Sequence, residues 1–93
     1  MSVVFKPGDL ASDSTCAVRK MMQEQYGTNV FLILRETTPE DYVRYFYMRS
    51  NITEDWLRRS LENKFYKSYL TVLIDTQVTL TSRNAIFLLC RVK

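Results

Sequence analysis

The sequence predicts a two-layer α+β domain in which three helices pack on one face of a mostly antiparallel sheet of three or four strands, in the order (β)αβααββ. Apolar residues recur at helical spacing in 9–26 and 37–68, and they alternate at strand spacing in 69–92. A continuous apolar run in 29–36 lies between the helical stretches. We expect residues 1–93 to form one compact domain, because this length suffices for a single core.

Composition favours a folded, soluble chain. The hydrophobic fraction is 46% and the aromatic fraction 13%, with only two Gly and two Pro. Residues 1–43 carry a net charge of −2 and residues 44–93 a net charge of +5, which together give the formal charge of +3. This basic excess is too small for a dedicated duplex-DNA binder.

The residue inventory excludes several kinds of catalytic site. The chain has no histidine, which removes Ser-His-Asp, Cys-His and His-metal arrangements. With glycine only at Gly8 and Gly27, no phosphate-binding glycine loop is possible. Cys16 and Cys90 cannot build a four-ligand zinc site, and their apolar neighbours predict two buried free thiols.

Acidic pairs have a structural explanation. Glu40 with Asp41, and Glu54 with Asp55, each fall in the first turn of a predicted helix, where capping and the helix dipole favour carboxylates. We therefore expect no enzymatic activity, cofactor or metal, although a nuclease site built from scattered carboxylates and a lysine stays open. Without a signal peptide or an apolar run of about 20 residues, a cytoplasmic setting is expected.

The first third of the chain predicts one helix between two strand candidates. Residues 3–5 form a short edge strand or a packed arm before Pro7. A helix is predicted over 9–26 and ends at Gly27, with cap candidates Asp9, Ser12 and Asp13. The apolar run in 29–36 predicts a central strand covered on both faces.

The segment Thr38-Pro39-Glu40-Asp41 predicts the start of the next helix, with Thr38 as N-cap and Pro39 at the first helical position. This cap decides against a strand over 42–49, which the β propensity there would also allow. The expected buried face consists of Tyr42, Val43, Phe46 and Tyr47, and the opposite face of Asp41, Arg44, Tyr45 and Met48.

A third helix is predicted to begin at Asn51, with Glu54 completing a capping box. Leu57, Leu61 and Phe65 are expected to face the sheet. A separate stripe would hold Trp56, Arg59, Asn63 and Tyr66, with Lys67 at its margin.

Apolar residues alternate at strand spacing from residue 69 to residue 92. Residues 69–80 alternate as one long strand with a bend or bulge near Asp75 and Thr76. Residues 81–84 are predicted to form the loop of a hairpin, whose second strand covers 85–92.

These features predict a protein-binding module, an adaptor or inhibitor of a larger assembly of the kind that small phage or viral accessory proteins represent. Trp, Tyr and Arg are frequent interface anchors. The candidate binding residues are Trp56, Arg59, Asn63, Tyr66, Lys67, Arg44, Tyr45 and Met48. Two alternatives stay open: the basic, aromatic second half could bind RNA or single-stranded DNA, or these side chains could simply pack and be solvated. A homodimer formed by strand or helix pairing is also compatible with the sequence.

Overall fold

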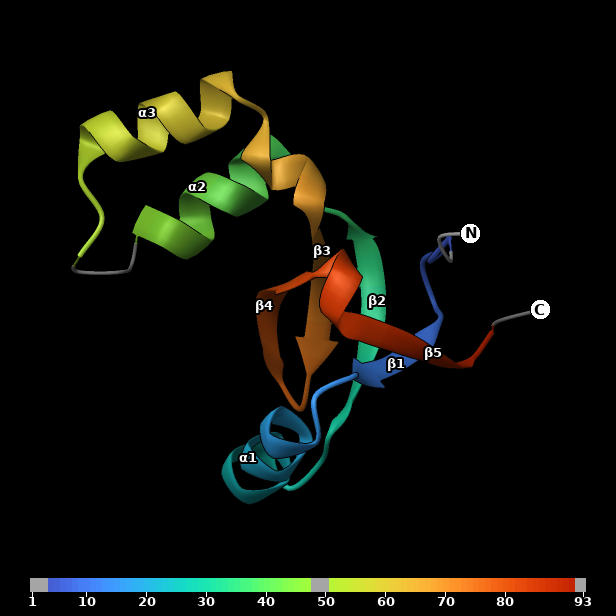
Figure 1. The fold of residues 1–93 in the computed structure, drawn as a ribbon. Helices are drawn as coiled ribbons and strands as arrows, with labels where there is room; N and C mark the ends of the chain where they lie inside the picture. The colour runs from blue at the N-terminus through green and yellow to red at the C-terminus, as the bar shows by residue number, and fades with distance from the viewer. Residues whose placement is uncertain (1–3, 48–50, 92–93) are drawn as a thin grey trace.

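A computed structural model describes residues 4–47 and 51–91 of the chain (Figure 1). Its α+β class and its three helices agree with the sequence prediction, whereas Met48 lies outside the described residues. The regular elements are β1 (Leu10–Asp13), α1 (Cys16–Tyr26), β2 (Val30–Glu36), α2 (Pro39–Tyr47), α3 (Glu54–Glu62), β3 (Tyr69–Ile74), β4 (Gln77–Ser82) and β5 (Ile86–Cys90), with short 3₁₀ turns η1 (Phe65–Ser68) and η2 (Arg83–Ala85).

The sheet has five antiparallel strands among the described residues, in the order β4-β3-β2-β1-β5. The predicted number of three or four strands is therefore wrong. One missed strand, β1, lies in the segment predicted as the start of a helix. Its four residues are too few for their spacing to reveal a strand, and only its neighbours β2 and β5 define it.

The first helix starts later than predicted and ends where predicted. It begins at Cys16, so Asp9, Ser12 and Asp13 do not cap it but lie buried beside or within β1. Gly27 ends the helix with a φ of 76°, and its N–H donates to the carbonyl of Gln23 at 3.0 Å. Of the two alternatives for residues 3–5, residues 4 and 5 form no strand, whereas Phe5 packs against the core as the second alternative expected, and residue 3 lies outside the described part.

The predicted long strand over 69–80 is a hairpin. Asp75 and Thr76 form a two-residue turn between Ile74 and Gln77, which pair with each other. Asp75 has a φ of 55°, a conformation that aspartate tolerates better than most residues. The predicted pairing of residues 69–80 with 85–92 is also wrong, because β5 pairs with β1.

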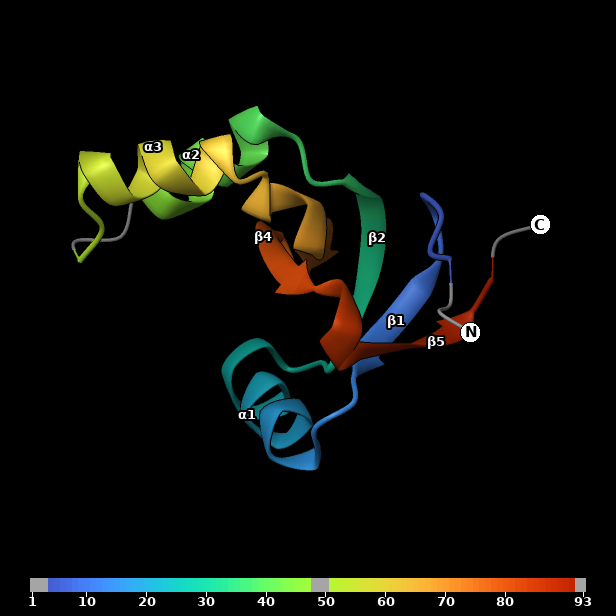
Figure 2. The ribbon, with the colours of Figure 1, turned by 45° about the horizontal axis from the view of Figure 1, so that its top comes forward.

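The sheet is strongly curled. Strands β4 and β5 are its opposite edges, yet only the three residues of η2 connect them. A flat sheet of this width would separate these edges by roughly 19 Å, whereas the connection spans at most roughly 14 Å. Accordingly, β1 and β5 run across the direction of β2 and β3 (Figures 1 and 2).

The hydrophobic core lies on the inner face of this curled sheet. It consists of Ala11, Phe31, Ile33, Leu70, Val72, Ile74 and Ile86 from the strands and Met22 from α1. The predicted layer of three helices on one face is not found. Helix α1 lies at one end of the sheet, and α2 and α3 lie together at the other end (Figures 1 and 2).

Candidate functional site

Helices α2 and α3 form an arm that stands off the sheet, and an aromatic cluster joins this arm to β3. Ring centroids of Phe46 lie 4.5 Å from Tyr42 and 5.4 Å from Trp56, and Tyr42 lies 5.9 Å from Tyr69. Tyr42 is only 1% exposed. Burial raises its pKa, and a hydrogen bond with the buried Ser60 opposes this rise. The cluster therefore forms a small second core that fixes the arm.

A polar network around the buried side chains of Asp41 and Thr71 attaches α2 of the same arm to β2 and β3. Arg35 donates from Nε and Nη2 to the two carboxylate oxygens of Asp41, at 2.9 and 2.7 Å. The hydroxyl of Thr71 donates to the same carboxylate at 3.0 Å. The Arg35 hydrogen bond is the main reason that the pKa of Asp41 is lowered to about 2, and burial of the carboxylate opposes it. Asp41 was predicted to point outward, but it is 9% exposed, because Arg35 and Thr71 compensate its desolvation.

The predicted N-cap of α2 at Thr38 is confirmed, and Asp41 adds a second hydrogen bond to it. The backbone N–H of Asp41 donates to the hydroxyl of Thr38 at 3.1 Å, and the N–H of Thr38 donates back to the Asp41 carboxylate at 3.3 Å. In α3, by contrast, the predicted N-cap Asn51 is two residues too early. Thr53 holds that position and accepts the N–H of Trp56 at 3.1 Å.

The other side of the arm carries an open apolar groove. Val43 and Tyr47 from α2 and Leu57 and Leu61 from α3 line a hollow of about 680 Å³, together with Glu54, Asp55 and Arg58. Val43 and Tyr47 also line an adjoining hollow of about 630 Å³, together with Pro39, Glu40 and Arg44. We call these two hollows the outer groove.

All four apolar residues of the outer groove were predicted to be core. Tyr47 is instead 74% exposed, and Val43, Leu57 and Leu61 are half-buried. Phe65, predicted to face the sheet, is 49% exposed. The helical spacing correctly identified apolar faces, but the arm extends beyond the sheet that was expected to cover them (Figure 2).

The predicted stripe on α3 is interrupted. The helix ends at Glu62, and Lys64 adopts a left-handed conformation with a φ of 57°. Tyr66 therefore lies in η1 and does not continue the row of Trp56 and Arg59. Trp56 packs in the aromatic cluster and is 39% exposed. The next two members of the stripe make local side-chain contacts. Arg59 forms a salt bridge with Asp55, and the side-chain amide of Asn63 donates to the carbonyl of Arg59.

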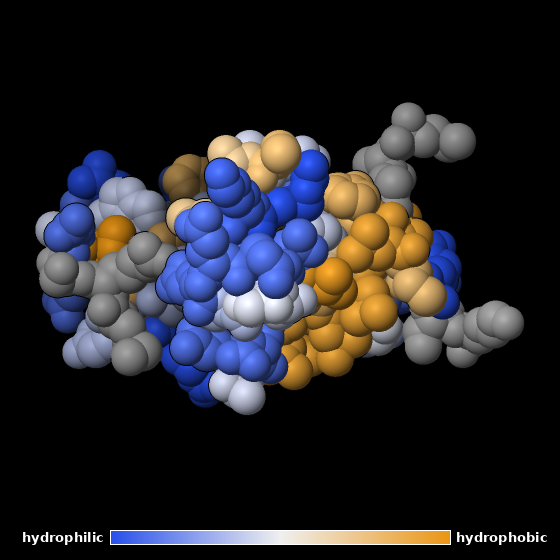
Figure 3. Space-filling view, turned by 90° about the horizontal axis from the view of Figure 1, so that it is seen from below, coloured by the Kyte–Doolittle hydropathy of each residue, from blue (hydrophilic) through white to orange (hydrophobic). Residues whose placement is uncertain are grey.

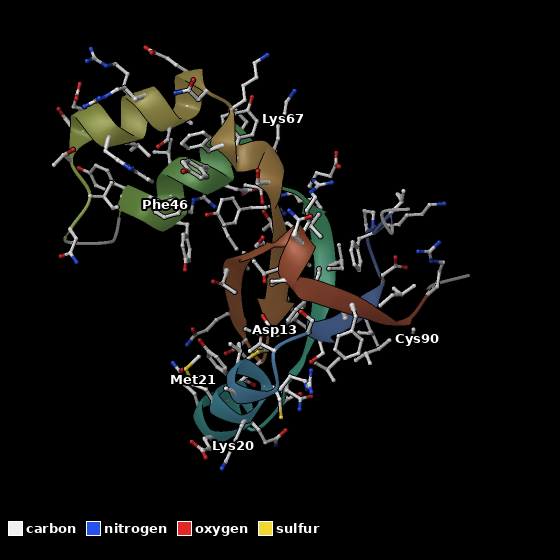
Figure 4. All side chains as sticks on the ribbon, viewed as in Figure 1. Asp13, Lys20, Met21, Phe46, Lys67 and Cys90 are labelled. Atoms are coloured by element: carbon white, nitrogen blue, oxygen red, sulfur yellow. The ribbon has the colours of Figure 1, made fainter. Side chains whose placement is uncertain are left out.

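Tyr66 and Lys67 belong to a different, polar hollow of about 380 Å³, which they line with Glu36, Thr37 and Arg83. Arg83 donates to Glu36 at 3.2 Å, and its buried Nε has no hydrogen-bond partner within the described part of the chain. Lys67, in η1, lies apart from Phe46, in α2 (Figure 4).

Arg44 and Tyr45 lie at a third place, between α2 and the sheet. They line a hollow of about 390 Å³ with Arg35, Asp41, Thr71, Val78, Thr79 and Leu80. Tyr45 also packs edge to face against Phe46, at 5.0 Å between ring centroids. The described members of the predicted site are thus distributed over several surfaces.

Cys16 and Cys90 are free thiols, as predicted, but both are exposed and not buried. Cys16 begins α1 on its solvent side, and Cys90 ends an edge strand outside the core. Their apolar neighbours gave no information about which side of each element would be covered.

Residues 4–47 and 51–91 contain no group of three or more Cys, Asp or Glu side chains that could hold a metal ion. No helix in these two ranges is long and apolar enough to cross a membrane. No protein-family model, curated protein or solved structure matches this chain. Its function must therefore be argued from its own surfaces.

Proposed function

We propose that this chain is a non-enzymatic protein-binding module, an adaptor or inhibitor, that receives an apolar segment of another protein in the outer groove. The observation that carries the proposal is the open row of Val43, Tyr47, Leu57 and Leu61. Adjacent apolar side chains that form a concave exposed surface are typical of interaction sites. An amphipathic helix is a suitable occupant, because such helices place apolar anchors between two receptor helices.

The contacts beneath the groove support this role. The aromatic cluster joins α2 to α3 and the Asp41 network fixes α2 to the sheet, so the two walls of the groove are placed side by side before a partner binds. Charges of both signs, from Glu40, Arg44, Glu54 and Arg58, border the groove and would orient a partner. The binding roles predicted for Trp56, Arg59, Asn63, Tyr66, Lys67, Arg44, Tyr45 and Met48 stay predictions; among the described members, Arg44 borders this groove.

The test compares two exposed aromatic residues, Tyr47 in α2 of the arm and Phe65 in η1, which follows the arm. Tyr47→Asp introduces a charge into the outer groove, and Phe65→Asp introduces the same charge at a side chain that does not line it. In affinity capture from an extract of the native host, after nuclease treatment, Tyr47→Asp should reduce the captured partner at least about tenfold. Phe65→Asp should capture as the unchanged chain does. Equal capture by all three chains would reject the groove as the binding site.

The nucleic-acid alternative has weaker support. Two of the arginines that motivated it, Arg58 and Arg59, pair with Asp55 on the surface of α3. If the chain nevertheless binds RNA or single-stranded DNA, its affinity should fall steeply with salt. Capture that disappears after nuclease treatment, together with a raised absorbance at 260 nm in purified protein, would favour this alternative over protein binding.

A further inference from the structure

The hollow beside Tyr45 lies between α2 and the face of the sheet opposite the core. Directly paired strand residues share one face of a sheet, and Arg35 pairs with Thr71, which pairs in turn with Leu80. Asp41 of α2 binds both Arg35 and Thr71, so α2 covers this face at that point. The hollow beside this contact has a volume of about 390 Å³, which is in the range of small-ligand pockets. We call it the Tyr45 hollow.

Part of the Tyr45 hollow is apolar. Val78 and Leu80 of β4 line it together with Tyr45. Val78 is 58% exposed, although it lies on a sheet face where polar residues are usual. The ring of Tyr45 is held edge to face against Phe46, at 5.0 Å between ring centroids. The apolar part of a small molecule placed here would remove this exposed surface from water, which favours binding.

The charged groups of the Tyr45 hollow leave a net positive charge, because two arginines and one aspartate line it. The aspartate, Asp41, is already compensated. One of its carboxylate oxygens accepts from Nη2 of Arg35, and the other accepts from Nε of Arg35 and from the hydroxyl of Thr71. Arg44, by contrast, makes no hydrogen bond or ion pair within residues 4–47 and 51–91. The charge that is left to compensate favours an anion.

We propose that the Tyr45 hollow binds a small organic carboxylate, with the carboxylate at Arg44 and the apolar part on the two β4 residues. A guanidinium suits this ligand because two of its N–H groups can donate in parallel to a carboxylate, as Arg35 does to Asp41. An inorganic anion would leave the apolar surface exposed. A neutral apolar molecule would leave Arg44 without a counter-charge.

The first test uses four probes and the unchanged full chain. Octanoate, octanol and octylamine share one apolar body and differ in the charge of the head group, and acetate has the carboxylate without that body. Titration monitored by NMR of the backbone amides measures each affinity. Octanoate should bind with a dissociation constant of about 1 mM or below. It should bind at least about threefold more tightly than octanol, with octylamine and acetate weaker still.

The same spectra locate the bound probe. The apolar surface on the side of the molecule that carries β1 and β5 (Figure 3) is a competing place for an apolar body. In the proposed mode, octanoate shifts the amides of Tyr45, Val78 and Leu80. Shifts centred on Phe87 and Leu89 would overturn the proposal. Equal affinities for octanoate and octylamine, or no response at about 10 mM octanoate, would also overturn it.

Matched substitutions separate the two contacts. Arg44→Gln should weaken octanoate about threefold and leave octanol unchanged. Lys20→Gln removes the same charge from α1, at the other end of the sheet (Figure 4), and should change neither affinity. Val78→Thr keeps the branched shape but adds a hydroxyl, and it should weaken both probes. Val4→Thr makes the same change at a valine that does not line the hollow, and it should weaken neither.

All four of these side chains are exposed, and the amide spectra show whether each variant is folded. Equal effects of Arg44→Gln and Lys20→Gln on octanoate would overturn the carboxylate contact. Equal effects of Val78→Thr and Val4→Thr would overturn the apolar contact. Val78 does not line the outer groove, so Val78→Thr should leave the capture of a protein partner unchanged. Either proposal can therefore fail without the other.

Discussion

At the scale of single residues, Asp41 has the most structural consequences. It was predicted only as an acid in the first turn of a helix, and that local role is present in its exchange of hydrogen bonds with Thr38. The structure adds two partners from the sheet, Arg35 on the preceding strand β2 and Thr71 on β3, 30 residues along the chain. One carboxylate thus holds α2 against β2 and β3.

This network predicts a specific dependence of stability on pH. The pKa of Asp41 is lowered from 3.8 to about 2 in the folded chain, so its contribution is complete above the unfolded value near 4 and is lost as the pH falls toward 2. A shift of this size corresponds to about 2 kcal/mol. Asp41→Asn should reduce the free energy of unfolding by about that amount at pH 7.

Denaturant unfolding between pH 2 and 7 provides the measurement. The curve of Asp41→Asn should be flatter than that of the unchanged chain between pH 4 and pH 2. The control, Asp55→Asn, removes an exposed carboxylate paired with Arg58 and Arg59, and it should change stability by less than about 1 kcal/mol. Parallel pH curves for the unchanged chain and Asp41→Asn would contradict the assigned role.

At the scale of elements, the β3 and β4 hairpin shows how a turn can be mistaken for a bend. The alternation of apolar residues continues in phase across Asp75 and Thr76, so strand spacing alone does not mark the reversal. The turn depends on the positive φ of Asp75. An Asn-Gly or Asp-Gly pair would have predicted such a turn, but Asp75 is followed by Thr76.

Substitutions at this turn should separate a hairpin from a bent strand. Asp75→Val places a branched side chain at a φ of 55° and should lower the free energy of unfolding by about 1 to 2 kcal/mol. Asp75→Gly removes the steric conflict and should cost nothing measurable. Thr76→Val, one residue later, should remain within about 0.5 kcal/mol. Thermal unfolding monitored by circular dichroism measures all three, and equal effects of Asp75→Val and Thr76→Val would contradict this turn.

At the scale of the whole molecule, the chain has two packed regions that differ in how many buried residues hold them. The inner face of the curled sheet and α1 contain the main core, which includes Ile33 and Val72 at 1% exposure. The arm is held by the aromatic cluster and the Asp41 network, and α3 contains one buried residue, Ser60. Few buried apolar contacts are typical of segments that open locally.

We therefore expect amide hydrogens of the main core and of the arm to exchange at different rates. Amides of β2 and β3 should exchange only through global unfolding, whereas those of α3 should exchange through a smaller opening. Phe46→Ala removes the ring between Tyr42 and Trp56, and it should accelerate exchange in α3 more than in β2. Mass spectrometry of exchanged peptides measures this, and equal protection of α3 and β2 before and after the substitution would contradict it.

The sequence by itself determined the features that depend on neighbouring residues. The cap of α2 at Thr38, the end of α1 at Gly27 and the central strand β2 follow from capping groups, glycine and a continuous apolar run. The alternation of apolar residues also located most of the strand residues near the end of the chain. For the proposed groove, the sequence identified the apolar faces of α2 and α3.

Only the tertiary structure decided which faces of the helices and strands are covered, and by which other elements. Strand β1 exists through its partners β2 and β5, and Asp41 is buried because Arg35 and Thr71 meet it from the sheet. The apolar face of α2 divides into a packed side at Tyr42 and an exposed side at Tyr47. Periodicity reports that a face is apolar but not what lies opposite, because that depends on the curl of the sheet and on contacts between residues far apart in the chain.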